Sequence, residues 1–138
     1  YIPFHMTTRE FFLEIRDLLN PGGVTAINVG RTKTDLRLVD ALASTMKLVH
    51  PHVFVIDIPS AINSIVVGTD ERGSLQAFQD NLARIEHPIL SQVADIARAN
   101  VREYNERPQG TPVFTDDLAP VEQVIDQILL GYIGQQSD

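Results

Sequence analysis

The sequence predicts an α/β fold in which three short strands alternate with amphipathic helices. The strands are predicted at 23–29, 53–58 and 63–69, where β-branched residues cluster between turn residues. The first two strands flank a helix, which predicts a strand–helix–strand unit with parallel strands and a right-handed crossover. The link between the second and third strands is short and contains Pro59, which predicts an antiparallel hairpin. If the third strand lies between the other two, it pairs on both sides, and the sheet order is first, third, second.

Five helices are predicted from apolar residues that recur at helical spacing. The first begins at a capping-box pattern, Thr7 followed by Glu10, and ends before Pro21 and Gly22. Pro88 separates the third helix from the fourth, because the first turn of a helix tolerates proline and the helix interior does not. The predicted helices span residues 7–20, 35–49, 74–87, 88–105 and 120–133.

Length and composition predict one domain over residues 1–138, because 138 residues with 43% hydrophobic content can bury a sizeable core. The net charge of −7 argues against a nucleic-acid partner and favours cationic small molecules. The absence of cysteine excludes disulfides, zinc–thiolate sites and thiol catalysis. No apolar run approaches the roughly 20 residues of a membrane-spanning helix, and no signal peptide is recognisable. We therefore expect a cytoplasmic protein without a membrane partner.

Four segments of the sequence resemble the C-terminal half of spermidine synthase-like proteins, the polyamine aminopropyltransferases. They are the opening run YIPFHMTTREFF at 1–12, the strand entry at 19–24, the strand at 63–69 and the run TDDLAPVE at 115–122. The resemblance implies the Rossmann-like fold of class I S-adenosylmethionine-dependent methyltransferases, with the three strands here as its fifth, sixth and seventh. In that fold the seventh strand lies between the fifth and sixth, which is the order inferred above.

The resemblance also implies that the nucleotide-binding part of the family fold precedes this sequence. No G-x-G-x-x-G turn follows a strand here, so no cofactor-binding residue is assigned. The sequence opens at Tyr1 within an apolar segment, as expected of the interior of a longer protein. We expect a C-terminal part of a catalytic domain that is inactive alone, with decarboxylated S-adenosylmethionine as the co-substrate of the complete enzyme.

The implied reaction transfers an aminopropyl group from decarboxylated S-adenosylmethionine to putrescine or a related amine. Such a reaction needs carboxylates that hold the distal ammonium group and a base that takes a proton from the attacking amine. The candidate substrate-binding residues are Tyr1, His5, Asp116, Asp117 and Glu122. Acidic residues near the start of a helix more commonly cap it and complement its dipole, so a structural role for the three acids competes with this interpretation.

Two other features have a structural and a functional interpretation. His50 and His52 would share one face of a strand, but with no third ligand nearby a structural role is favoured and no metal site is predicted. The loop at 30–34 joins a strand end to a helix N-terminus, where a phosphate or sulfate can bind. It lacks the full phosphate-loop spacing, so an ordinary capped helix start is favoured.

Two further functional classes remain open. One is a non-catalytic dimerising or partner-binding module of the same fold, and the other is part of a methyltransferase with another acceptor. An upstream strand with a glycine-rich turn and a following acidic residue would distinguish an enzyme from a binding module. The apolar strand at 23–29 is expected at an edge of the sheet, and proteins protect or pair such edges. We therefore expect a homo-oligomer formed through that edge.

Overall fold

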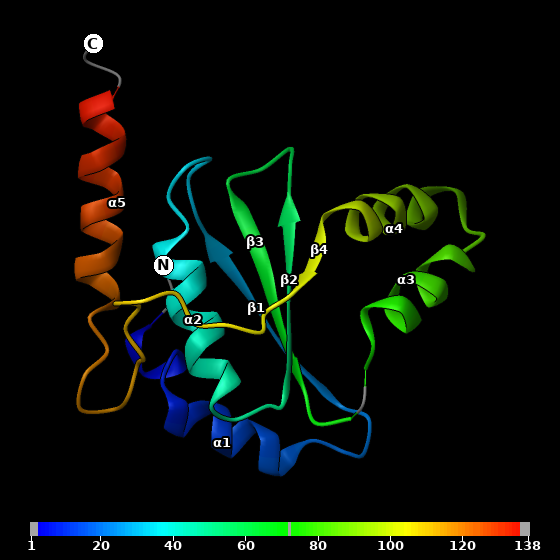
Figure 1. Ribbon diagram of the computed structural model, residues 1–138, viewed down its shortest axis with the longest axis horizontal. Coiled ribbons are helices and arrows are strands. Elements are labelled where there is room, and N and C mark those ends of the chain that lie inside the picture. Colours follow the sequence, from blue (N-terminus) through cyan, green and yellow to red (C-terminus); the bar gives the residue numbers. More distant parts are fainter. Residues whose placement is uncertain (1–2, 72, 136–138) are drawn as a thin grey trace.

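A four-stranded sheet forms the centre of the fold (Figure 1). The structure is a computed structural model that describes residues 3–71 and 73–135, with side chains described as far as residue 131. The strand order is β1-β3-β2-β4, and every neighbouring pair is antiparallel. The strands are β1 (Val24–Gly30), β2 (His52–Ile58), β3 (Asn63–Thr69) and β4 (Val101–Glu103). Because β3 runs against both β1 and β2, the latter two are parallel to one another. The predicted hairpin and the central position of the third strand are therefore confirmed.

The predicted number of strands is wrong, because the sheet has four strands and not three. The helix predicted at 88–105 ends earlier, as α4 (Pro88–Asn100), and the next three residues form β4. In the register of this pair Val101 lies opposite Ile56, and the Tyr104 amide donates to the Val53 carbonyl at 2.8 Å. The free edge of β2 offers hydrogen bonds that a continued helix would leave unused, so tertiary pairing overrides the local helical pattern.

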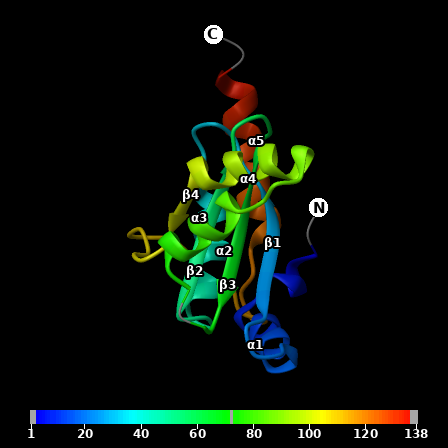
Figure 2. The ribbon, with the colours of Figure 1, turned by 90° about the vertical axis from the view of Figure 1, so that its right-hand side faces the viewer.

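The helices cover the two faces of the sheet unequally (Figure 2). On one face α2 (Arg37–Lys47) contacts β1, β2 and β3, and it in turn contacts α1 (Arg9–Leu18) and α5 (Val121–Gln135). On the other face α3 (Leu75–Ala83) packs against α4, and of the strands α4 contacts β2 and α3 contacts β4. The face of β1 and β3 that points away from α2 is therefore covered much less than the face that packs against α2.

The first helix is preceded by a short 3-10 helix, η1 (Phe4–Met6), and its cap differs from the prediction. The N-cap is Thr8, not Thr7, because Thr8 has an extended backbone and its Oγ1 accepts from the Phe11 amide at 3.2 Å. The Thr7 hydroxyl donates instead to the Phe4 carbonyl and fixes η1 against the helix. All five predicted helices exist, and their boundaries differ from the prediction by at most five residues.

The hydrophobic core lies between the sheet and the layer formed by α1, α2 and α5. Helix α2 is its centre, since every residue from Leu38 to Met46 except Asp40 is buried. Side chains from β1, β2, β3, α1 and the segment after β4 surround it. The largest fully buried apolar side chains are Phe12, Val29, Val39, Leu42, Met46, Val53, Val55, Val66, Phe114 and Val121. Within the described ranges, no helix combines the length and apolar character needed to span a membrane.

Candidate functional site

The N-terminal segment and a turn near the C-terminus meet on one side of the core. The Arg9 amide donates to the Phe114 carbonyl at 2.9 Å, and the Asp116 amide donates to Glu10 Oε2 at 3.1 Å. The Phe114 amide donates to Thr45 Oγ1 at 2.9 Å, within the buried core. These three bonds attach the turn to both α1 and α2, although the residues are far apart in the sequence.

A small cavity of about 270 Å³ lies at this junction. We call it the acidic cavity, and its lining residues are Phe4, His5, Phe11, Glu14 and Asp116. The rings of Phe4 and His5 meet edge to face with their centroids 5.6 Å apart. Two carboxylates and two phenyl rings around one space provide ion pairing and cation–π contacts, the interactions that recognise an ammonium group.

Two of the five predicted site residues are brought together by the structure. His5 and Asp116 both line the acidic cavity, from η1 and from the C-terminal turn. Tyr1 lies outside the described residues. Asp117 and Glu122 are not among the residues that line the cavity, and all four of the predicted site residues that the structure describes are exposed. Only His5 and Asp116 therefore have a position that suits the predicted role.

The capping alternative suits only one of the three acids. Thr115 and Leu118 exchange two backbone hydrogen bonds of 3.0 Å, so Asp116 and Asp117 occupy the two central positions of a tight turn. Helix α5 begins later, at Val121, and Glu122 lies in its first turn, where a negative charge complements the helix dipole.

Sequence reasoning missed three residues of the acidic cavity, namely Phe4, Phe11 and Glu14. Phe11 and Phe12 are adjacent, but Phe12 is 1% exposed whereas Phe11 is only half-buried. The available signal was helical spacing, because Phe11 and Glu14 are three residues apart and share a face of α1.

Apart from the acidic cavity, a cluster of charged and polar side chains lies where β1 and β2 end. The Asp57 carboxylate lies between two guanidinium groups, 3.7 Å from Arg31 Nε and 3.9 Å from Arg102 Nε. The Ser64 hydroxyl donates to Asp57 at 2.5 Å and accepts from Arg31 Nε at 2.9 Å. The cluster thus fixes the guanidinium group of Arg31 at the end of the sheet.

Burial perturbs two groups beside this cluster. Desolvation raises the pKa of Asp40, an effect that Arg102 opposes and Asp57 reinforces. Burial likewise raises the pKa of the Tyr104 phenol, whose oxygen shares a 2.8 Å hydrogen bond with Ser44 and donates to the Asp40 carbonyl. These contacts connect α2 to the segment that follows β4.

The loop between β1 and α2 is ordered by its own side chains. Thr32 Oγ1 accepts from the Asp35 amide at 2.9 Å, and Asp35 forms an ion pair with Arg37 at 2.6 Å. Hydrogen bonding from Arg37 lowers the pKa of Asp35. Leu36 occupies the N-cap position and has no capping side chain, so the expected cap is replaced by these contacts within the loop.

His50 is fully buried, and both of its ring nitrogens have protein partners. Nδ1 lies 2.6 Å from Asp70 Oδ1, and Nε2 lies 3.1 Å from Thr25 Oγ1. Since the carboxylate can only accept, Nδ1 carries the proton in this arrangement. His50 precedes β2, whereas His52 is its first residue, so the two do not form the strand pair considered above. The residues described contain no group of three or more His, Cys, Asp or Glu side chains suited to a metal ion.

Comparison with known proteins yields two informative similarities. The chain is 29% identical over 154 aligned positions to a probable polyamine aminopropyl transferase from Bifidobacterium longum (strain NCC 2705). That alignment includes 96% of this chain and 34% of the relative. The structure superposes on a probable spermidine synthase from Corynebacterium glutamicum ATCC 13032 with a TM-score of 0.55 and 24% identity, over 85% of this chain and 43% of that one. No family model matches the sequence.

The fold defines the class of protein: an α/β unit with the methyltransferase-like fold of spermidine synthase. The chain spans about a third of the length of the curated relative that it matches. Together the two similarities confirm the resemblance to spermidine synthase-like proteins, the polyamine aminopropyltransferases.

Proposed function

We propose that this chain supplies the amine-holding part of an aminopropyltransferase. The complete enzyme would transfer an aminopropyl group from decarboxylated S-adenosylmethionine to putrescine or a related amine. The observation that carries this proposal is the acidic cavity, because two of the four segments that carry the family resemblance, at 1–12 and 115–122, meet there. The similarity to a probable polyamine aminopropyl transferase supports the same substrate class.

Each group in the acidic cavity has a defined role in this proposal. The carboxylates of Glu14 and Asp116 hold an ammonium group, and the rings of Phe4 and Phe11 contact its methylene chain. The imidazole of His5, which lines the same cavity, provides a nitrogen that can accept a proton from an amine. The reaction also needs a nucleoside-binding segment, which this sequence does not contain, so we expect no turnover by the chain alone.

An NMR titration with putrescine tests the amine site. We expect saturable shifts at residues around the acidic cavity, with a Kd of about 1 mM, which corresponds to a binding free energy of about −4 kcal/mol. Asp116→Asn should raise the Kd about tenfold, because a charged hydrogen bond is worth about 1.5 kcal/mol. Its neighbour Asp117, outside the cavity lining, provides a matched control, and Asp117→Asn should change the Kd less than about twofold.

Two results would contradict the amine site. One is an equal loss of affinity in the Asp116 and Asp117 variants, which would indicate general attraction to an acidic surface. The other is an equal response to 1,4-butanediol, which has the length of putrescine without its charge. Spermidine in a parallel titration shows whether a longer polyamine binds more tightly.

We propose further that the chain forms a homo-oligomer through β1. This strand is seven residues long and lies at the edge of the sheet. Charged residues and proline usually protect such an edge from pairing, and β1 contains neither. Its residues Val24, Ala26 and Asn28 are exposed, and Val24 is 55% exposed. A second copy pairing along β1 would satisfy the outward backbone groups of both strands.

Light scattering with amide exchange tests this pairing. We expect a dimer whose amides at 24–29 exchange slowly, and Val24→Lys should shift it toward monomer by placing a charge at the edge. Ile89→Lys is the control, because Ile89 is 68% exposed on α4, which packs against β2. A strict monomer with fast exchange along 24–29 would exclude an oligomer of this kind.

A further inference from the structure

A second, larger cavity lies at the end of the sheet where β1 and β2 finish. It measures about 590 Å³, within the usual range for small-molecule sites, and is open to solvent. One wall is the loop after β1, with Arg31 and Lys33, and the other is the β2–β3 turn at 59–62. Ligands of open α/β sheets usually bind outside the carboxyl ends of parallel strands, and β1 and β2 are parallel. We call this space the basic cavity.

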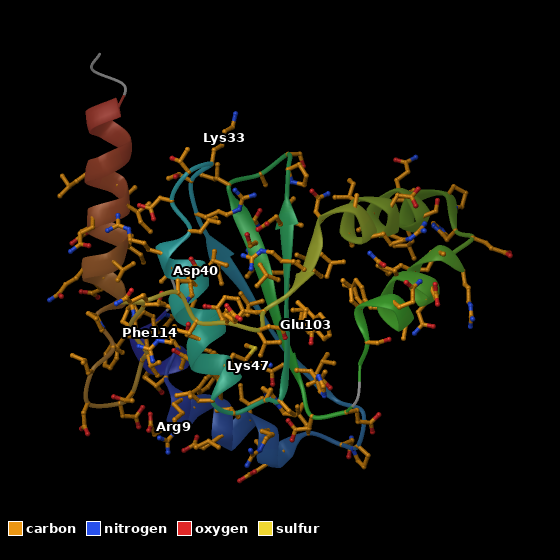
Figure 3. The ribbon with its side chains drawn as sticks, in the orientation of Figure 1. Arg9, Lys33, Asp40, Lys47, Glu103 and Phe114 are labelled. Carbon is orange, nitrogen blue, oxygen red and sulfur yellow. The ribbon has the colours of Figure 1, made fainter. Side chains whose placement is uncertain are left out.

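The two cationic side chains of the basic cavity differ in mobility and complement each other. The Arg31 side chain is only 11% exposed, and its guanidinium group donates to Ser64 Oγ and to the Thr32 carbonyl. It is therefore held in one orientation before any ligand arrives, which lowers the entropic cost of binding. Lys33 is exposed at the top of the loop, as Figure 3 shows, and is free to adjust to a ligand.

The charge around the basic cavity has the opposite sign to that of the protein. The net charge of the chain is −7, yet no acidic residue is among those that line this cavity. Asp57, the nearest partner of Arg31, is shared with Arg102 at 3.9 Å, so one carboxylate faces two guanidinium groups. Asp35 in the same loop is paired with Arg37 at 2.6 Å. A local positive excess therefore remains at the cavity.

We propose that the basic cavity binds the carboxylate or phosphate group of a small molecule. Arg31 offers fixed donors to the anionic group, and Lys33 adds a mobile charge. Pro59, Ala61 and Ile62 form the rest of the wall and contact an apolar portion of the same ligand. The basic cavity shares no lining residue with the acidic cavity, so this site stands independently of the proposed amine site.

NMR titrations of the whole chain with inorganic phosphate and with succinate test this site. We expect saturable shifts of the amides at 31–34 and 60–62 with at least one of the two, at a Kd of about 1 mM at low salt. The arm with the lower Kd identifies whether phosphate or carboxylate is preferred. Lys33→Gln should raise that Kd about fivefold, and Arg31→Lys should raise it more, because lysine lacks the planar set of donors.

The control variant for these titrations removes one positive charge at a position outside the basic cavity. Lys47 lies in the last turn of α2, at the opposite end of that helix, and donates to the Pro51 carbonyl (Figure 3). Lys47→Gln should leave the Kd within about twofold of the parent value. The proposal fails if neither anion gives saturable shifts at these two segments, or if Lys47→Gln weakens binding as much as Lys33→Gln. Comparison of native amide spectra before titration shows that each variant is folded.

Discussion

Replacement of Gly68 by alanine is expected to destabilise this protein far more than the same replacement at Gly30, the other strand glycine. A Cβ at Gly68 would lie 2.5 Å from Cδ2 of His50 and 2.7 Å from Sδ of Met46, closer than real carbon contacts. Both neighbours are fully buried, and His50 is held by Thr25 and Asp70. The ring cannot move without breaking these bonds, so we expect the free energy of unfolding to fall by about 3 kcal/mol.

Gly30 provides the control, because it is also a strand glycine without positive φ. No described atom lies within 4 Å of a Cβ built there, so Gly30→Ala should change the free energy of unfolding by less than about 0.5 kcal/mol. The sequence contains no tryptophan, so urea unfolding is best followed by far-ultraviolet circular dichroism. Equal midpoints for the two variants would show that β3 does not pack this tightly against α2.

Phe114→Ala is expected to affect both stability and the acidic cavity. Phe114 is fully buried, and its backbone connects the C-terminal turn to Arg9 and Thr45 (Figure 3). Truncation of a buried phenylalanine costs about 4 kcal/mol, through lost burial and the cavity that remains. A loosened turn also misplaces Asp116, so the Kd for putrescine should rise, with an effect as large as that of Asp116→Asn.

Leu118→Ala is the matched control, since Leu118 belongs to the same turn and is 64% exposed. It should cost less than about 0.5 kcal/mol and leave putrescine binding unchanged. If Phe114→Ala does not fold, Phe114→Leu, which retains most of the buried volume, should show a smaller loss of both properties. If the Phe114 variants lose stability but bind putrescine with unchanged affinity, the turn does not contribute to the amine site.

The candidate site was predictable only in part, for a reason that lies in its geometry. His5 and Asp116 were selected through the family resemblance, and the structure places them in one cavity. Glu10 and Asp116 are 106 positions apart, so no local pattern indicates that they touch. The basic cavity is similar in this respect, because Arg31 faces a turn that follows the next strand in the chain.

The amino-acid sequence alone determined the three main strands, the existence of the five helices and the order of the first three strands. These features depend on local properties: β-branched runs between turn residues, helical spacing of apolar residues, and the short link that makes the second and third strands a hairpin. Only the tertiary structure decided that Val101–Glu103 forms a fourth strand, that Thr8 caps α1, and that Asp116 but not Asp117 lines the acidic cavity. Each of these depends on a partner distant in the chain or on the position of a single side chain, and neither is encoded in local periodicity.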